Sequence, residues 1–112
     1  MNKKTTKEFY VDSVVKLDAI YWISGSCDKG CIKTGDTFSE AYQLTIKKSL
    51  PGEPYYFEIT GRKDIRDIKL QVVNIRSYRR DFDQLHKGMT GELYLQGEGG
   101  NYLKERDKLG VY

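Results

Sequence analysis

The chain has few of the residues on which metal and redox sites depend, with two cysteines and one histidine among 112 residues. Cys27 and Cys31 flank a short Asp-Lys-Gly turn, and His86 is the sole further soft ligand. Two thiols make half of a tetrahedral zinc site, so the ligand set is incomplete. Free thiols in a reducing compartment, a redox-sensitive pair and a zinc knuckle remain alternatives, and the first is favoured. We predict no metal and no cofactor.

Signatures of catalysis are also missing. The sequence has no G-x-x-x-x-G-K-[ST] loop to cradle phosphates, which excludes a nucleotide site of that kind. His86 stands alone as a turn histidine, without a nucleophile and an orienting group around it. Asp81 and Asp83 are better explained as turn aspartates than as an acid/base pair. We therefore predict that the chain is not an enzyme and has no catalytic residues.

Long apolar runs are absent as well. No stretch approaches the roughly 20 apolar residues of a membrane span, and the lysines near the start precede no signal-peptide core. These absences predict a cytoplasmic protein without a membrane partner. The formal net charge of +3 is weak evidence for a polyanion partner, because many domains of this size carry such a surplus.

The residues that are present predict an all-β fold. Short runs rich in β-branched and aromatic residues alternate with turn signals at near-regular spacing, and no long amphipathic helix interrupts them. We predict a flexible tail over residues 1–8 and a single small domain, a closed or partly open β-barrel, over residues 9–112. Gly30 and Gly35 are expected to supply positive φ in two tight turns.

Several local predictions accompany this fold. The alternation over 9–17 puts Phe9, Val11, Ser13, Val15 and Leu17 on one side of a strand. In 68–78, the longest strand signal, Leu70, Val72, Asn74, Arg76 and Tyr78 should share a face. The charged segment 62–67 is expected to form a connection with a helical turn. The segment 79–91 is also expected to form a connection with a short helical turn.

Two ordered motifs resemble the second domain of translational GTPases such as elongation factor Tu. The stretch "YWISGSCDKGCIKTGD" is similar to that family's pair of strands and turns. It matches at Gly25, Gly30, Ile32, Lys33, Gly35 and Asp36. The stretch "LQVVNIRSYRRDFDQLHKGMTGELYLQGEG" is similar to a later part of the same domain. It matches at Ile75, Tyr78, Arg79, Arg80, Gly88, Gly91, Leu93, Leu95 and Gly97.

The resemblance covers most of residues 9–110 and implies the second domain standing alone, without its GTPase. Residues 41–67 look longer than the family's hairpin. The stretch "LKERDKL" resembles the family's closing motif but lacks its glycine at 105–107. In elongation factor Tu a glutamate and an arginine on the strand aligned with 72–80 approach the aminoacyl end of tRNA. The aligned positions here are Arg76 and Arg79. An arginine without the carboxylate argues against that aminoacyl-tRNA pocket.

Basic residues gather near the end of the predicted long strand and on the last strand. If they converge with an exposed aromatic, they form a surface that binds phosphates and stacks bases. The candidate RNA-binding residues are Arg76, Tyr78, Arg79, Arg80, Lys104 and Arg106. The alternative is a solvated surface neutralised by the interleaved aspartates and glutamates.

Aromatic residues supply a second candidate surface. Trp22, Tyr55 and Tyr56 either pack within the fold or form an exposed cluster that binds a protein. The sequence thus predicts a non-enzymatic binding module that contacts RNA or a ribonucleoprotein through a basic face. The alternative is a protein-interaction module, either a translation-factor mimic or an inhibitor of the immunity type. The oligomeric state is left open.

Overall fold

The computed structural model describes residues 6–111, apart from the side chains of Ile46 and Tyr102. Nine strands and one short 3-10 helix make up these described residues. The strands are β1 (Lys7–Leu17), β2 (Ile20–Lys29), β3 (Cys31–Lys33), β4 (Thr37–Lys48), β5 (Phe57–Ser77), β6 (Arg80–Phe82), β7 (Gln84–His86), β8 (Thr90–Glu98) and β9 (Lys108–Val111), and the helix is η1 (Gly100–Tyr102). β1 begins at Lys7, slightly before the boundary expected from the sequence.

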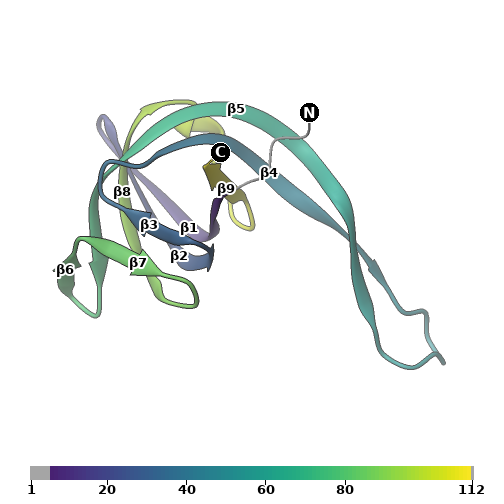
Figure 1. The fold of residues 1–112 in the computed structure, drawn as a ribbon. Helices are drawn as coiled ribbons and strands as arrows, with labels where there is room; N and C mark the ends of the chain where they lie inside the picture. Colours follow the sequence, from purple (N-terminus) through teal and green to yellow (C-terminus); the bar gives the residue numbers. More distant parts are fainter. Residues whose placement is uncertain (1–5, 112) are drawn as a thin grey trace.

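Six of the strands form a closed ring. They pair in the order β4-β9-β1-β2-β8-β5, and β4 also pairs with β5, which completes the circuit (Figure 1). β6 extends the sheet beside the end of β5, and β3 and β7 form a separate pair. The observed pairings are antiparallel. This all-β ring confirms the predicted fold class.

The ring encloses one hydrophobic core. Every ring strand contributes to it, from Phe9 and Val11 on β1 to Leu109 on β9. Leu85 on β7 and Ile32 on β3 join the same cluster and close one end of the ring. Fully burying each such side chain stabilises the fold by about 1.5–3 kcal/mol, so the core holds the ring closed.

A β-bulge in β1 corrects the predicted alternation of that strand. Phe9 and Val11 are fully buried as expected, but the pairing with β2 shifts register between Val11 and Ser13. Beyond the shift, Val14 packs against the core, whereas Val15 is 45% exposed. The extra residue of a bulge reverses which side chains face inward. The single face predicted for 9–17 is therefore wrong after Val11.

A second bulge changes the facing of β5. Leu70 and Val72 are buried, the register with β8 shifts between Val72 and Asn74, and Ile75 and Ser77 are then the buried residues. The predicted face, with Arg76 beside Leu70 and Val72, is wrong beyond this point. The bulge turns Arg76 away from the core, where its charge would have been costly.

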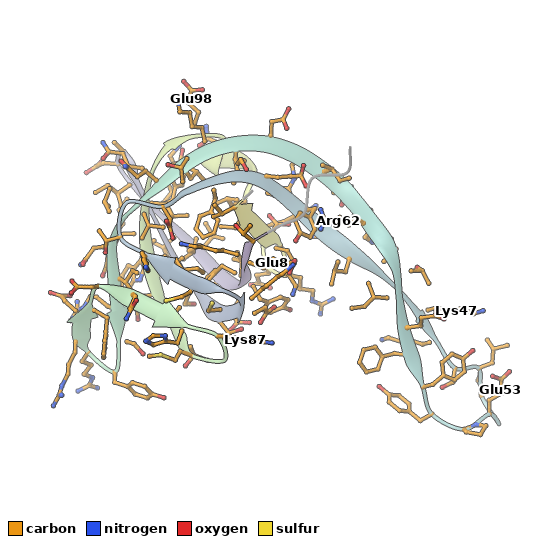
Figure 2. All side chains as sticks on the ribbon, in the orientation of Figure 1. Glu8, Lys47, Glu53, Arg62, Lys87 and Glu98 are labelled. Carbon is orange, nitrogen blue, oxygen red and sulfur yellow. The ribbon has the colours of Figure 1, made fainter. Side chains whose placement is uncertain are left out.

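The middle of the chain forms a long two-stranded arm. β4 and β5 pair from Thr37 and Gln71 outward to Lys48 and Phe57, and the outer part leaves the ring (Figure 1). Residues 62–67, predicted as a helical connection, lie within β5, because β4 offers them a continuous partner. Figure 2 shows the labelled Lys47 and Glu53 at the far end of this arm.

The segment 79–91 also differs from its prediction. It forms the short strands β6 and β7 before β8 begins, and β7 pairs with β3 over Cys31 and His86, Ile32 and Leu85, and Lys33 and Gln84. The turn predictions are confirmed, since Gly30 and Gly35 have φ of 72° and 97°. Among the described residues no helix has the length and apolar character needed to cross a membrane.

Candidate nucleic-acid interface

The turn between β5 and β6 presents an aromatic and a basic side chain on a strained backbone. Ser77 pairs with Arg80, so Tyr78 and Arg79 form a two-residue hairpin turn. Both have positive φ, 52° and 64°. A turn of this kind favours Asn-Gly, because most L-residues resist the left-handed conformation. Tyr78 is nevertheless 82% exposed, so its ring does not compensate for the strain by packing.

The base of this hairpin is fixed to the ring. Ile75 is fully buried, and the buried Ser77 donates its hydroxyl to the carbonyl of Thr90 at 2.7 Å. Phe82 on β6 packs against the core from the other strand. The strained tip is therefore held by a buried base, as expected of a turn that positions its side chains for binding.

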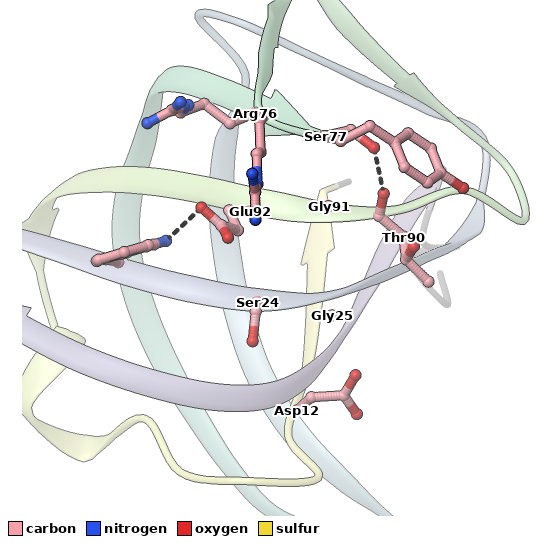
Figure 3. A pocket seen from close by; sticks show the side chains of 11 residues that line it. Asp12, Ser24, Gly25, Arg76, Ser77, Thr90, Gly91 and Glu92 are labelled. Atoms are coloured by element: carbon pink, nitrogen blue, oxygen red, sulfur yellow. Dashed lines mark hydrogen bonds between the residues drawn. The ribbon is translucent and has the colours of Figure 1, made fainter.

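A hollow of about 440 Å³ lies beside the hairpin on the outer face of the ring. Its lining comes from β1, β2, β8 and the end of β5, and consists of Asp12, Trp22, Ser24, Gly25, Arg76, Ser77, Tyr78, Arg79, Thr90, Gly91 and Glu92. In Figure 3, Arg76 and Ser77 lie on one side and Asp12 on the other, with Ser24 and Glu92 between them. Both signs of charge are therefore present along the hollow.

The glycine floor of the hollow depends on close strand approach. A Cβ atom at Gly25 would lie 1.7 Å from the carbonyl oxygen of Tyr10, and one at Gly91 would lie 2.9 Å from the carbonyl oxygen of Arg76. Real side chains do not tolerate such contacts. The two matched glycines of the sequence motif thus allow β1, β2, β8 and β5 to meet here.

Arg76 is partly matched by its surroundings. Its Nε lies 3.6 Å from Asp81 Oδ1. A side-chain hydrogen bond to Tyr94, with smaller contributions from the Asp81 and Glu92 carboxylates, raises the pKa of Arg76 further above its usual value. Arg76 is therefore held in its charged form, and nearby carboxylates offset part of its field.

Arg79 and Arg80 differ from Arg76 in this respect. Both are exposed, and neither forms an ion pair with any residue in the described range 6–111. Their charge is open to a ligand from outside. The structure thus brings Arg76, Tyr78, Arg79 and Arg80 together at the hairpin.

Lys104 and Arg106 lie elsewhere, in the turn before β9 and not on a strand as the sequence suggested. Arg106 donates its backbone N–H to the carbonyl of Val11 on β1. From β1, the strand order leads through β2 and β8 to β5, which carries Arg76. Four steps of about 4.8 Å put the two arginines roughly 19 Å apart around the sheet. Lys104 also pairs with Asp64 at 3.4 Å.

The aromatic candidates occupy two separate places. Trp22 is half-buried in the hollow, where it stacks on Tyr94 with ring centroids 5.6 Å apart and donates its Nε1–H to Glu92 at 3.0 Å. Tyr55 and Tyr56 lie at the arm tip, 82% and 41% exposed. Trp22 therefore belongs with the hairpin, and the tyrosines belong with the arm.

The cysteines face different neighbours. Cys27 is fully buried, with its Sγ 3.4 Å from the carbonyl oxygen of Gly30, and burial raises the pKa of its thiol. Cys31 Sγ lies 3.3 Å from Gln84 Oε1 and 3.7 Å from His86 Nδ1. His86 is thus on β7 opposite Cys31 rather than in a turn. Within residues 6–111 both thiols are free, and no three ligand side chains group together as a metal site.

Sequence reasoning did not single out two charged residues of the hollow, Asp12 and Glu92. Asp12 lies at the β1 bulge, and Glu92 is directed outward from β8 opposite Arg76. In β8, Leu93 and Leu95 point inward, so the alternation of the strand predicts an outward Glu92. The alternation of β1 does not predict the facing of Asp12, because the bulge between Val11 and Ser13 interrupts it.

Solved structures with this architecture exist. Translation elongation factor SelB from Methanococcus maripaludis matches in its apo form with a TM-score of 0.66 and 15% identity, over 98% of this chain and 20% of that chain. The same factor in complex with the GTP analogue GppNHp matches with a TM-score of 0.65, at the same identity and coverage. No protein-family model and no curated protein matches the sequence.

The chain has the fold of a translation-factor domain. This confirms the fold that the two motifs predicted. The chain spans about a fifth of the length of the factor it matches, and at 15% identity the likeness concerns the fold alone.

Proposed function

We propose that the protein is a non-catalytic binding module of the cytoplasm that contacts RNA or a ribonucleoprotein through the β5–β6 hairpin. The observation that carries this proposal is the exposed Tyr78–Arg79 turn, which is strained and is followed directly by Arg80. Backbone strain that the surrounding structure holds in place clusters at functional sites. A turn without a function would be more stable with residues that favour positive φ, such as Asn-Gly.

The side chains of the turn suit single-stranded RNA. An exposed tyrosine ring stacks on a base, and stacking of this kind contributes about 1–3 kcal/mol per base. Arg79 and Arg80, which form no ion pair in the described range, bind backbone phosphates and release counterions. Arg76 contributes less, because Asp81 and Glu92 already offset its charge.

Charge reversal tests this proposal. The variant Arg79→Glu/Arg80→Glu is compared with the matched control Lys69→Glu/Lys87→Glu, whose lysines line neither the hollow nor the hairpin. Affinity for a single-stranded oligoribonucleotide is measured by fluorescence anisotropy along a KCl series. Loss of two phosphate contacts should flatten the slope of log K against log salt by about 1.4, whereas the control keeps the wild-type slope. Equal affinity and slope in both variants would refute the proposal.

A second variant separates binding from stability. Replacing the turn by Asn-Gly, as Tyr78→Asn/Arg79→Gly, removes both side chains and supplies residues that favour positive φ. Thermal unfolding should show a protein more stable by about 1–2 kcal/mol, while RNA affinity falls. Retained RNA affinity in this more stable protein would argue against the hairpin as the contact.

The arm tip favours protein binding as a second candidate function. The protein would then act as a translation-factor mimic or as an inhibitor of the immunity type. The tip exposes large apolar side chains far from the core: Leu50 (66%), Tyr55 (82%), Phe57 (59%) and Ile59 (56%). Apolar side chains on a projecting hairpin fit an apolar cleft in a protein, and such contacts tolerate salt better than phosphate contacts do.

Affinity capture distinguishes the two candidates. The tagged protein and a Tyr55→Ser/Phe57→Ser variant are exposed to native lysate with and without nuclease, and retained material is eluted along a salt gradient. RNA that is lost on nuclease treatment supports the hairpin proposal. A single protein that survives nuclease and moderate salt, and is lost in the tip variant, supports the arm as the binding element.

A further inference from the structure

A second pocket lies at the root of the arm, separate from the hollow beside the hairpin. It has a volume of about 210 Å³ and is lined by Tyr10, Gln43, Leu44, Lys63, Arg106 and Lys108. Strand pairing brings these residues together, since Lys108 on β9 lies between Tyr10 on β1 and Tyr42 on β4, and Gln43 pairs with Lys63. The pocket therefore lies over β5, β4, β9 and β1, on the outer face of the ring.

Three cationic side chains line this small pocket. Lys108 is neutralised in part, because its Nζ forms an ion pair with Asp28. Lys63 and Arg106 form no ion pair with any residue that the structure describes. Asp64, the carboxylate next to Lys63 in sequence, pairs instead with Lys104 at 3.4 Å. The lining holds three cations and no carboxylate, and the two carboxylates bonded to it, Asp28 and Asp107, form ion pairs with Lys108 and Arg66. The positive charge that remains favours an anion.

The backbone holds Arg106 in place at a cost. Its φ is 71°, a conformation that a non-glycine residue adopts with strain, and its N–H donates to Val11 at 2.8 Å. Gln43 ties the same turn to β4, because its Nε2 donates to Asp107 Oδ1 at 3.2 Å and to the Glu105 carbonyl at 3.4 Å. The backbone of Arg106 is thus tied to β1, while its exposed side chain lines the pocket beside two lysines.

The remaining lining defines the kind of anion. The ring of Tyr10 and the side chain of Leu44 form an apolar wall, and Lys108 Nζ lies 5.9 Å from the Tyr10 ring centroid. The volume is below the roughly 300 Å³ at which drug-sized ligands begin, so it suits a phosphate with part of its sugar or base. Arginine and lysine are the side chains that bind phosphate oxygens, and a tyrosine face accepts a base or sugar.

We propose that this root pocket binds the phosphate group of a nucleotide, with Lys63 and Arg106 on the phosphate and Tyr10 against the nucleoside. The phosphate belongs either to an RNA strand or to a free mononucleotide. The first source rests on the proposed function. β1 borders both the root pocket and the hollow, through Tyr10 and Asp12, so one strand of RNA can contact both.

The test uses the full chain and two double variants of equal charge change. Lys63→Gln/Arg106→Asn removes both unpaired cations, with asparagine chosen because it tolerates positive φ. Lys69→Gln/Lys87→Gln is the control, outside both pockets. One arm titrates AMP and inorganic phosphate into isotope-labelled protein and follows the amides of Tyr10 and Leu44 by NMR. The other arm measures oligoribonucleotide affinity along a salt series.

The expected result is loss of binding in at least one arm. A rise of about tenfold or more in the AMP dissociation constant assigns a free nucleotide. A salt slope flattened by about 1.4 assigns a strand phosphate. Wild-type behaviour of the pocket variant in both arms would overturn the proposal. Lys63→Glu alone, at an exposed position, repeats both measurements if the double variant unfolds.

These results also separate this inference from the hairpin proposal. RNA binding that depends on Arg79 and Arg80 and is unchanged in the pocket variant, with no AMP effect, refutes the root pocket alone. The opposite result is AMP binding that depends on Lys63 and Arg106, together with an RNA affinity that is unchanged in Arg79→Glu/Arg80→Glu. This result refutes the hairpin proposal alone.

Discussion

At the scale of single residues, Asp107 is a carboxylate that connects three parts of the fold. It is fully buried and accepts hydrogen bonds from Arg66 Nη2 at 2.7 Å, from Gln43 Nε2 at 3.2 Å and from the backbone N–H of Lys104 at 2.9 Å. These partners come from β5, from β4 and from the turn before β9. Asp107 therefore joins the arm to the ring, and it occupies the segment where the sequence departs from the family pattern.

Neutralising this carboxylate should be costly. Asp107→Asn removes the charge of a fully buried carboxylate that pairs with Arg66, and breaking such a pair destabilises a protein by about 3 kcal/mol. Urea denaturation measures the difference from wild type. The control, Asp64→Asn, removes a half-exposed partner of Lys104 and should cost below about 1 kcal/mol. Equal losses for the two variants would show that Asp107 does not join the elements as described.

The two cysteines should differ in reactivity. Cys27 is fully buried and its pKa is raised by burial, so in the native state it stays a protonated thiol out of contact with reagents. Cys31 is partly exposed. Iodoacetamide at about pH 8, followed by mass spectrometry, should label Cys31 first, and Cys27 only at the rate of unfolding. In a Cys27→Ala protein the fast label should remain.

The sign of the pH effect follows from the raised pKa of Cys27. Folding favours its neutral thiol, so the stability due to this preference is present at neutral pH and is lost as the pH rises through the folded-state pKa. Fast labelling of Cys27 in the native protein would contradict its burial.

At the scale of elements, the arm and the ring are stabilised differently. Among residues 45 and 47–61, whose side chains the structure describes, none belongs to the core cluster, and β4 and β5 pair along this outer arm. Its inner end is fixed by Arg62, which forms an ion pair with Glu40 at 3.3 Å and lies 4.1 Å from the centroid of the Tyr42 ring. The outer arm is thus an addition that the core does not require.

Shortening the arm should leave the fold intact. Leu44 pairs with Arg62, so replacing residues 45–61 by Asn-Gly gives a two-residue hairpin in the same register. The melting temperature should change by no more than about 4 °C, since none of the described side chains that are removed belongs to the core cluster. RNA affinity should persist if the β5–β6 hairpin binds the RNA. Capture of a protein partner should be lost if the arm tip binds it. A protein that fails to fold without these residues would contradict this division.

At the scale of the whole molecule, closure of the ring depends on its shortest member. β9 pairs with β1 over Lys7 to Tyr10 and with β4 over Glu40 to Tyr42, and it adds Leu109 to the core. It thereby joins the two ends of the described chain to the middle. Contacts between residues so distant in sequence form late and cooperatively.

Removing residues 108–111 should therefore abolish the cooperative fold. Both β1 and β4 would then present open edges, and the core would face solvent between them. Thermal melting followed by circular dichroism should lose its sigmoidal transition, and the dispersion of amide resonances should collapse. The arm-shortened protein, which loses more residues, is the control and should melt cooperatively. A sharp melt of the truncated chain would mean that the ring closes without β9.

The sequence alone determined the features that depend on local chemistry. Gly30 and Gly35 identified two turns because positive φ is a local requirement, and the alternating apolar runs identified most strands of the ring. The Tyr78–Arg80 stretch could likewise be singled out as a basic and aromatic surface, since adjacent residues stay together in any fold. The ordered glycine motifs then sufficed to predict the fold class.

Only the tertiary structure decided the rest. Two bulges reversed the facing of β1 and β5, because an extra residue is placed by the register with a neighbouring strand and not by the alternation itself. Residues 62–67 became strand because β4 lies beside them. The strand order separated Arg106 from Arg76 and brought it to Lys63 and Lys108, so the residues of the single basic face expected from the sequence lie beside two separate hollows. Pairing between distant segments is a property of the closed ring, and no local window of the sequence contains it.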